Sequence, residues 1–201
     1  PPRSTLFPYT TLFRSTDPLG RDILTRIIFG ARVSVIIAIT ALTIGGGFGT
    51  LVGLTAGFYG GKIDTILMRF ADITLAFPLI LFAILLVMVL GPSMINVIIA
   101  ISLVLWARYA RVIRGEVLGL MQRDFIARAK VSGASDWRIM MRHLLPNVMP
   151  TLIVLLTLQV GWVIIVEASL SFLGAGIPPP TPAWGSMLAD GREYEIGRAH
   201  V

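Results

Sequence analysis

The 201-residue sequence contains no cysteine and few charged residues. Without cysteine, this chain cannot form a disulfide framework, a thiolate zinc site or an iron–sulfur cluster. Only 14% of its residues are charged and 55% are hydrophobic, whereas soluble domains carry about 25% charged residues. The mean hydropathy of +0.82 points the same way. This balance argues against a water-soluble globule.

The sequence also lacks the common motifs of nucleotide and metal chemistry. Its nearest match to a phosphate-binding loop, residues 57–62, has Ala56 in place of the first glycine and Ile63 in place of the hydroxyl residue. We therefore do not expect the chain to hydrolyse ATP. The two histidines, His143 and His200, form no His-Glu-x-x-His pair. No catalytic residue, cofactor-binding residue or metal ligand is assigned.

Long uncharged runs take the place of these motifs. Residues 33–61, 73–107 and 144–166 carry no formal charge, and each run is long enough as a helix to cross a ~30 Å hydrocarbon core. The second run is too long for one span, and the turn signal Gly91-Pro92-Ser93 divides it. The four predicted spans cover residues 33–57, 73–90, 94–108 and 147–170, with a kink at Pro78.

The distribution of basic residues predicts the orientation. Residues 108–142 hold eight of the 17 lysines and arginines and three acidic residues, so this segment is expected on the cytoplasmic side. Alternation then places segment 58–72 inside as a loop. Residues 16–32, the Gly91 turn and the tail after Ser171 lie outside. Cytoplasmic loops explain the net charge of +6 better than a nucleic-acid-binding groove does.

The two external segments differ in pattern. Residues 16–32 are predicted to form an external interfacial segment, because apolar residues at helical spacing within 21–32 suit an amphipathic helix on the membrane surface. The transmembrane domain then covers residues 33–170. Residues 171–194 are predicted to form an extended external loop, since prolines within 174–186 cannot continue a helix.

A glycine pattern marks the first predicted span. Gly45, Gly49, Gly53 and Gly57 are each four residues apart. On a helix they form one stripe along which a neighbouring backbone can approach closely. The stripe predicts a packed helix bundle. The alternative is a flexible, glycine-rich membrane segment.

Ionisable residues near the spans allow more than one interpretation. Glu167 lies near the end of the last predicted span, where an ionisable group is a candidate for a pathway or gate. The alternative is a glutamate that stays hydrated at the external interface. Arg108, Arg111 and Arg114 follow the third span at three-residue intervals. They are expected to snorkel to the membrane surface and fix the orientation.

The cytoplasmic loop 109–146 is the most informative segment. Apolar residues at helical spacing flank a turn: Phe125, Ile126 and Ala129 before it, and Trp137, Met140 and Met141 after it. Gly133 supplies a permissive backbone position, and Ser135 can cap the following helix. We predict a helix, a sharp turn and a second helix, which together we call the elbow. Such an elbow suits a lever for a soluble partner, although it could equally pack on its own bundle.

The elbow resembles the coupling-loop signature of ABC importer permeases. That signature reads Glu-Ala-Ala, three residues, Gly, nine residues, Ile-x-Leu-Pro. Ala129, Gly133, Leu145 and Pro146 match it, whereas Ala127, Arg128 and His143 replace the glutamate, the first alanine and the isoleucine. The ATPase-coupling residues implied by this resemblance are Ala127, Arg128, Ala129, Gly133, Ala134, Ser135, Asp136, Trp137, Leu145 and Pro146.

Other stretches resemble one branch of that family. Residues 16–34, 167–176 and Trp184-Gly185 are similar to the C-type permease subunit of dipeptide and oligopeptide importers, a branch that includes nickel importers. The resemblance covers residues 16–194. It implies the type I ABC importer permease fold with six spans, of which this chain would hold the second to fifth. Residues 1–15 and 195–201 resemble translated sequencing-adapter sequence and are expected to be non-native.

The resemblance implies an all-α, multi-pass permease in the cytoplasmic (inner) membrane of a bacterium or archaeon. Its expected partners are a second permease subunit, two ATPase subunits that bind the ATP, an external substrate-binding protein and membrane lipid. The expected substrates are di- and oligopeptides. Alternatives are an importer of nickel or another small solute, a self-contained channel or proton-coupled carrier, and a structural anchor.

Overall fold

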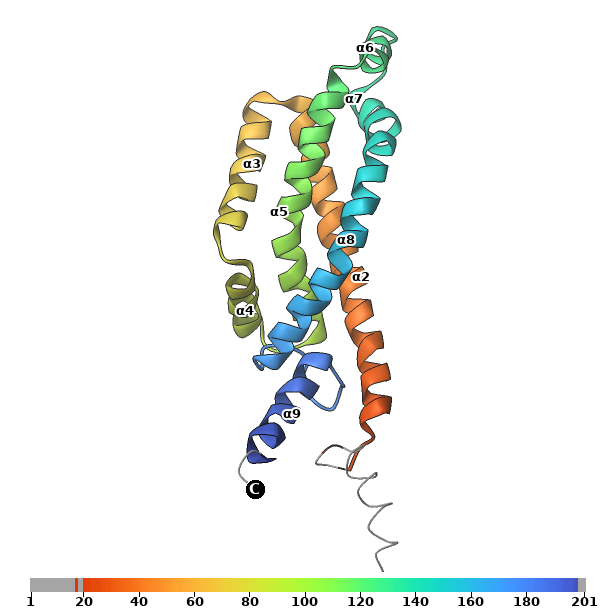
Figure 1. Ribbon diagram of the computed structural model, residues 1–201. Helices are drawn as coiled ribbons and strands as arrows, with labels where there is room; N and C mark the ends of the chain where they lie inside the picture. Colours follow the sequence, from red (N-terminus) through yellow and green to blue (C-terminus); the bar gives the residue numbers. More distant parts are fainter. Residues whose placement is uncertain (1–16, 18–19, 199–201) are drawn as a thin grey trace, which may run out of the picture.

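The computed structural model describes residues 17 and 20–198, and these residues form helices joined by loops (Figure 1). The predicted all-α membrane bundle is confirmed. The proposed non-native residues 1–15 lie outside the described part. The long helices are α2 (Ile23–Tyr59), α5 (Met94–Met121) and α8 (Leu145–Phe172). The shorter elements are α3 (Gly61–Ala76), α4 (Leu79–Leu90), α6 (Asp124–Val131), α7 (Asp136–Ile139), the π-helical turn η2 (Met140–Leu144) and α9 (Trp184–Arg198).

Three stretches of the described chain are long and apolar enough to cross a membrane: α2, α5 and the continuous stretch from α7 to the end of α8. Helices α3 and α4 meet at an angle of 90°. They add a fourth span if this bent pair is counted as one span. The bend confirms the kink predicted at Pro78. Phe77 before it is extended, with φ −82° and ψ 138°, since a proline ring disfavours helical backbone in the preceding residue.

Two predictions for the segments before the bend are wrong. The stretch 21–32 is no separate interfacial helix, because α2 runs unbroken from Ile23 to Tyr59. Nothing stops the helix there, since a single glycine such as Gly30 is tolerated within a helix. The stretch 58–72 is no loop either, since most of it is helix α3. The charges of this stretch therefore do not mark the end of regular structure.

Two later boundaries also differ from the prediction. Helix α5 continues to Met121 rather than ending at residue 108, because a cluster of positive charge marks the membrane surface and does not stop a helix. The proline-rich stretch 173–183 is non-helical, as expected. However, helix α9 follows it from Trp184, since no proline lies beyond Pro182.

The start of α2 is held by two aspartates. Asp22 caps the helix, and its carboxylate accepts a hydrogen bond from the Thr25 backbone N–H at 2.7 Å. Asp17 accepts from the Arg21 backbone N–H at 2.8 Å and the Arg21 Nε at 2.6 Å, and pairs with Arg26. Burial alone would raise the pKa of the Asp17 carboxyl. The hydrogen bonds from both arginines outweigh that effect and lower the pKa to about 2.

The glycine stripe of α2 lies against α5. A Cβ added at any of the four glycines would come closer to α5 than van der Waals contact allows. At Gly49 it would collide with the Trp106 carbonyl oxygen. The nearest atoms elsewhere are the Ser102 carbonyl oxygen at 2.9 Å for Gly45, the Ala110 carbonyl oxygen at 2.6 Å for Gly53 and Val117 Cγ1 at 2.7 Å for Gly57. This packing of helix on helix leaves no room for a flexible segment.

Ion pairs fasten α3 to the other side of α5. The Arg114 guanidinium forms two bonds to the Asp64 carboxylate, with Nη2 and Oδ2 2.6 Å apart, and Arg111 pairs with Asp72. The snorkelling expected of these arginines stays a prediction, and the ion pairs are contacts that the sequence reasoning missed. The carboxylates that they find are 39 and 50 residues away in the sequence. Arg108 instead lies over the Trp162 ring of α8, at 5.7 Å from its centre.

Replacing Gly49 by alanine is expected to destabilise the chain by about 1–3 kcal/mol, because the added methyl group overpacks the α2–α5 contact. Gly47 provides the matched control, since it is exposed on the same helix and a Cβ there would meet nothing within 4 Å. Gly47→Ala should be neutral or stabilise the chain by up to about 1 kcal/mol, because alanine loses less backbone conformational entropy than glycine on folding. Thermal unfolding in nanodiscs measures both. Equal effects would contradict close packing at Gly49.

Arg114→Ala is expected to lower the free energy of unfolding by about 1–3 kcal/mol, because it leaves the shielded Asp64 carboxylate unpaired. The Asp64 side chain is 14% exposed, whereas both side chains of the Arg111–Asp72 pair are about half exposed. Arg111→Ala should therefore cost less than about 1 kcal/mol. The same unfolding measurement, repeated at high salt, compares the two. A larger loss from Arg111→Ala would contradict this assignment.

Candidate functional site: the elbow

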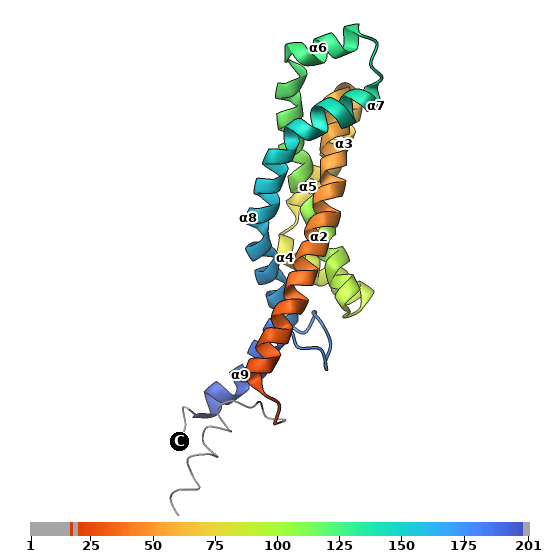
Figure 2. The ribbon, with the colours of Figure 1, turned by 90° about the vertical axis from the view of Figure 1, so that its right-hand side faces the viewer.

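The elbow lies at one end of the bundle, beyond α5 and α8 (Figure 1). Helix α6 lies across this end, and α7 returns the chain toward the bundle (Figure 2). The predicted sequence of helix, turn and helix is confirmed. Only Gln122 and Arg123 separate α5 from α6. Helix α7 continues through η2 into α8 without a break in helical structure. The elbow is therefore joined directly to two long helices.

The turn of the elbow is a Schellman motif. The Ala134 N–H donates to the Ala129 carbonyl at 3.1 Å, and the Gly133 N–H donates to the Lys130 carbonyl at 3.0 Å. These are the two bonds that define the motif. Gly133 has a φ of +76°, which glycine adopts without strain. Ala129 and Ala134, both half-buried, pack against the apolar core.

The second arm of the elbow begins at a cap. The Ser135 hydroxyl accepts a hydrogen bond from the Arg138 N–H at 3.4 Å, as its position predicted. Asp136 lies in the first turn of α7, where a negative charge suits the helix dipole. Helix α7 passes into the wider turn η2, in which the Leu145 N–H donates to the Met140 carbonyl. The wide turn relieves the clash that the Pro146 ring would make in a regular helix.

The elbow has a buried underside and an exposed top. Ile126, Ile139, Met140 and Leu144 are buried against the bundle. The predicted coupling residues Ala127, Arg128, Gly133, Ser135, Asp136, Trp137 and Pro146 are exposed, and Ala129, Ala134 and Leu145 are half-buried. One face of the elbow therefore packs on the bundle while the other is exposed, and the lever stays a prediction.

The apolar residues of the second arm of the elbow differ in exposure. Trp137 does not share a buried face with Met140, since its side chain is 66% exposed while Met140 is buried. Ile139, which the sequence reasoning missed, takes the buried position instead. The change from α-helix to π-helix at Met140 shifts the register of the faces. The sequence signal for this shift is Pro146, whose ring disfavours a regular helix in the turn before it.

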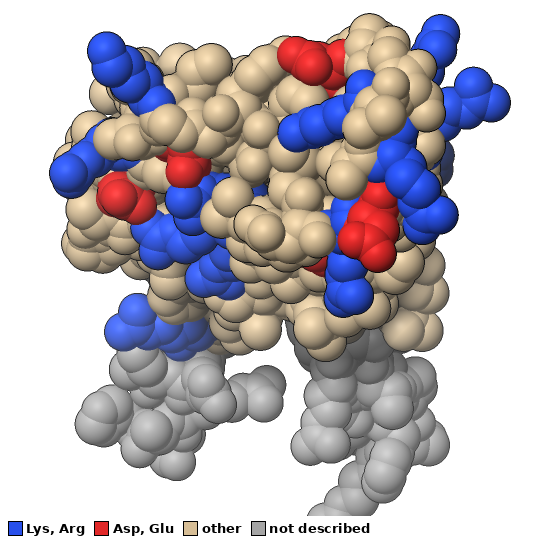
Figure 3. Space-filling view, turned by 90° about the horizontal axis from the view of Figure 1, so that it is seen from above, with Lys and Arg blue, Asp and Glu red and all other residues tan. Residues whose placement is uncertain are grey.

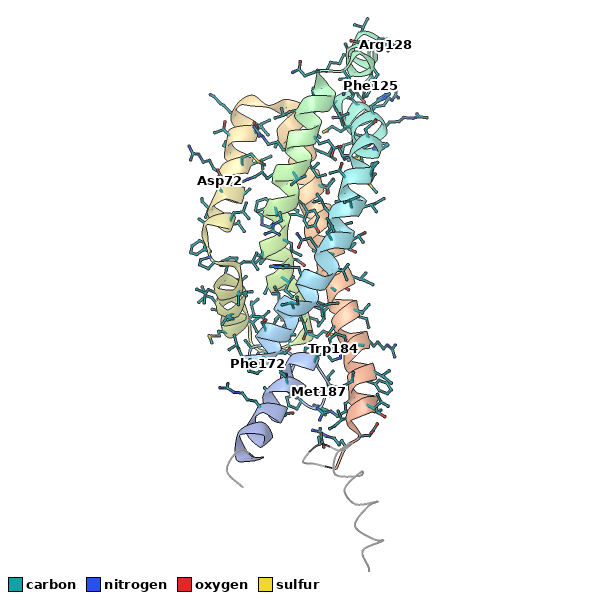
Figure 4. The ribbon with its side chains drawn as sticks, viewed as in Figure 1. Asp72, Phe125, Arg128, Phe172, Trp184 and Met187 are labelled. Atoms are coloured by element: carbon teal, nitrogen blue, oxygen red, sulfur yellow. The ribbon has the colours of Figure 1, made fainter. Side chains whose placement is uncertain are left out.

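Aromatic contacts seat the elbow on the helix ends below it. The Lys130 ammonium lies 5.7 Å from the centre of the Phe58 ring, near the end of α2. The rings of Phe125 and His143 lie 6.5 Å apart. Figure 4 shows Phe125 and Arg128 at this end of the molecule. Sequence reasoning did not identify Phe58, because this contact joins segments 72 residues apart and no local pattern marks it.

Seen end-on, the elbow end carries many more basic than acidic side chains, set among residues without formal charge (Figure 3). The basic residues of α6, α7 and η2 are Arg128, Lys130, Arg138, Arg142 and His143. A surface of this kind suits either lipid phosphates or a partner with a mixed polar and apolar groove.

Glu167 differs from its prediction. The hydrated-interface interpretation is wrong, because the side chain is fully buried. Its two carboxylate oxygens accept hydrogen bonds from the Ser34 and Ser171 hydroxyls, each at 2.8 Å. Ser34 lies on α2 and was not identified from the sequence. Within residues 17 and 20–198, no group of three or more histidine, aspartate or glutamate side chains is placed to hold a metal ion.

Residues 49–194 match the family described as the binding-protein-dependent transport system inner membrane component. The chain is 41% identical over 194 residues to the glutathione transport system permease protein GsiD of Pectobacterium atrosepticum, covering 96% of this chain and 64% of that protein. It is 46% identical over 179 residues to the dipeptide transport system permease protein DppC of Alkalihalophilus pseudofirmus (89% and 59%). It is also 46% identical over 185 residues to GsiD of Escherichia coli (92% and 61%).

The chain therefore belongs to the family of binding-protein-dependent transport system inner membrane components. It spans 59–64% of the length of these relatives. The predicted resemblance to a peptide-type ABC permease subunit is confirmed at the level of the family.

Proposed function

We propose that this chain forms part of a permease subunit in an ATP-driven, binding-protein-dependent importer of di- or oligopeptides. The observation that carries the proposal is the elbow, which is anchored on the bundle by its underside and exposed on top. The names of the relatives, which include dipeptide and glutathione permeases, support a peptide-type substrate over nickel.

In this function, the exposed top of the elbow receives a cytoplasmic ATPase subunit. Trp137 is the largest exposed apolar group there, and an exposed aromatic side chain is a typical anchor in a partner's pocket. ATP is bound and hydrolysed by two such ATPase subunits, while this chain supplies no cofactor site. A second permease subunit completes the pathway, and an external binding protein delivers the peptide. The assembly resides in the inner membrane of a bacterium or archaeon.

The elbow transmits force because of how it is joined to the spans. Movement of the ATPase displaces α6 and α7 together, since the Schellman turn and the buried underside hold their angle. The displacement passes to α5 through the two-residue link and to α8 through η2. A tilt of these helices relative to a second permease subunit changes which side of the pathway is open. This is alternating access driven from the cytoplasmic side.

Gly133→Pro is expected to uncouple ATP hydrolysis from uptake. Proline cannot adopt the φ of +76° found at Gly133, and it lacks the N–H that bonds to Lys130. A proline in an incompatible backbone position destabilises the local structure by ~3 kcal/mol. Because the turn would then lose its shape, we expect uptake to fall at least about tenfold. Membrane insertion and basal ATPase activity should persist. The measurement is labelled dipeptide uptake and ATP hydrolysis in proteoliposomes that contain the whole importer.

Gly119→Ala is the matched control, since Gly119 lies on α5 and a Cβ there would meet nothing within 4 Å. It should leave both uptake and ATP hydrolysis unchanged. Normal uptake by Gly133→Pro would contradict the proposal that the elbow acts as a lever. Uptake by the unaltered importer that needs no ATP would instead support the alternative of a self-contained carrier.

A further inference from the structure

We propose that Glu167 is the positioning residue of a clasp that fixes the outer ends of α2, α8 and α9 to one another. The clasp makes these three helix ends a single outer unit, which moves whole when the pathway opens toward the outside. The movement rests on the proposed transport function, whereas the clasp itself does not.

The first observation is a buried polar bridge between α2 and α8. Glu167 on α8 is fully buried, and so is Ser34 on α2, at 0% exposure. The Ser34 hydroxyl reaches one carboxylate oxygen and the Ser171 hydroxyl reaches the other, each at 2.8 Å. If α2 and α8 parted here, the carboxyl and the Ser34 hydroxyl would lose their partners in an apolar setting. Leaving buried polar groups unpaired raises the free energy of the folded state.

The second observation is that α9 closes over the same place. The Trp184 indole N–H donates to the Ile27 carbonyl on α2 at 2.9 Å. A Cβ on Gly30 would lie 2.9 Å from Trp184 Cδ1, so the indole fills the space that this glycine leaves open. On the other side, Gly185 lies against the Ala168 backbone of α8 so closely that any Cβ would collide with it. Helix α9 is thus wedged between α2 and α8.

The third observation is the fit of the connecting loop. Gly176 packs on Ser171, one of the two serines that bind the glutamate, and any Cβ there would collide with it. Ala175, Ile177 and Ala183 are buried at the same end. Figure 4 shows Phe172, Trp184 and Met187 gathered where α8 and α9 meet. The loop therefore covers the bridge and keeps it away from water.

These contacts distinguish a clasp from a pathway group. Both oxygens of Glu167 are engaged within this chain, and the side chain has no exposed surface. A group that binds a passing substrate needs a free face. Glu167 instead acts through Ser34 and Ser171 on the relative placement of the helices, so its role depends on its two hydrogen bonds.

The test compares Glu167→Gln with Glu167→Leu in the whole importer. The glutamine amide can accept one hydrogen bond and donate another to a serine hydroxyl, so uptake and the thermal midpoint should stay close to those of the unaltered protein. Leucine makes neither bond. We expect uptake to fall about tenfold and the thermal midpoint to drop, as for a lost buried polar bridge. If Glu167→Gln loses uptake as leucine does, or if Glu167→Leu behaves normally, the clasp is overturned.

A cross-link tests the same idea without relying on Glu167→Leu to fold. The sequence contains no cysteine, so cysteines at Gly30 and Trp184 can be joined by a short, reducible bifunctional reagent. Because the clasp does not open, the cross-linked importer should take up dipeptide as well as, or better than, the same double variant before cross-linking. Loss of uptake on cross-linking, reversed by reductant, would show that α2 and α9 separate during transport, and would refute the proposal.

The two proposals can fail separately. Cross-linking yield and the thermal midpoint are measured without any transport. If Glu167→Leu lowers both the cross-linking yield and the thermal midpoint, the clasp is supported. If the unaltered importer takes up no peptide, only the proposed function is rejected. If transport is normal but neither quantity responds to Glu167→Leu, the clasp is rejected and the function stands.

Discussion

The structure depends first on the close approach of the α2 and α5 backbones. In a membrane, helices gain little by hiding apolar surface from one another, because lipid is equally apolar. Association must come from packing, and four glycines in register allow close contact along the segment of α2 from Gly45 to Gly57. The other contacts are arranged around this pair: α3 is fixed to α5 by ion pairs, and α8 lies against both helices. The position of the elbow follows, since it grows from the ends of α5 and α8.

The two ends of the bundle are held by different kinds of contact. At the elbow end, backbone hydrogen bonds set the angle of the elbow, and its top is exposed. At the outer end, polar side chains and a wedged helix join three elements and leave little free. An element that must be gripped by a partner needs a stiff shape and an open face. An element that must move as one piece needs internal bonds. The described residues supply the first at one end and the second at the other.

The sequence predicted what depends on composition and short spacing. Uncharged runs predicted the spans, the pattern of Gly45 to Gly57 predicted a packed face, and Gly133 with Ser135 predicted the turn and its cap. Contacts between distant segments could not be predicted from the sequence. No local pattern pairs Asp64 with Arg114, Phe58 with Lys130 or Ser34 with Glu167. Helix ends at the membrane surface were also missed, because a change of charge marks the surface without stopping the helix, as the continuation of α5 to Met121 shows.

The Schellman turn has a consequence for how such subunits diversify. Its hydrogen bonds involve only the backbone from Ala129 to Ala134, and its one strict side-chain requirement is the glycine at 133. Ala127 and Arg128 lie outside the turn on the exposed top, where the signature has a glutamate and an alanine. The shape of the elbow is therefore independent of the residues that a partner touches. Under the proposed function, residues 127 and 128 can change to fit a different ATPase subunit while the shape of the elbow stays the same.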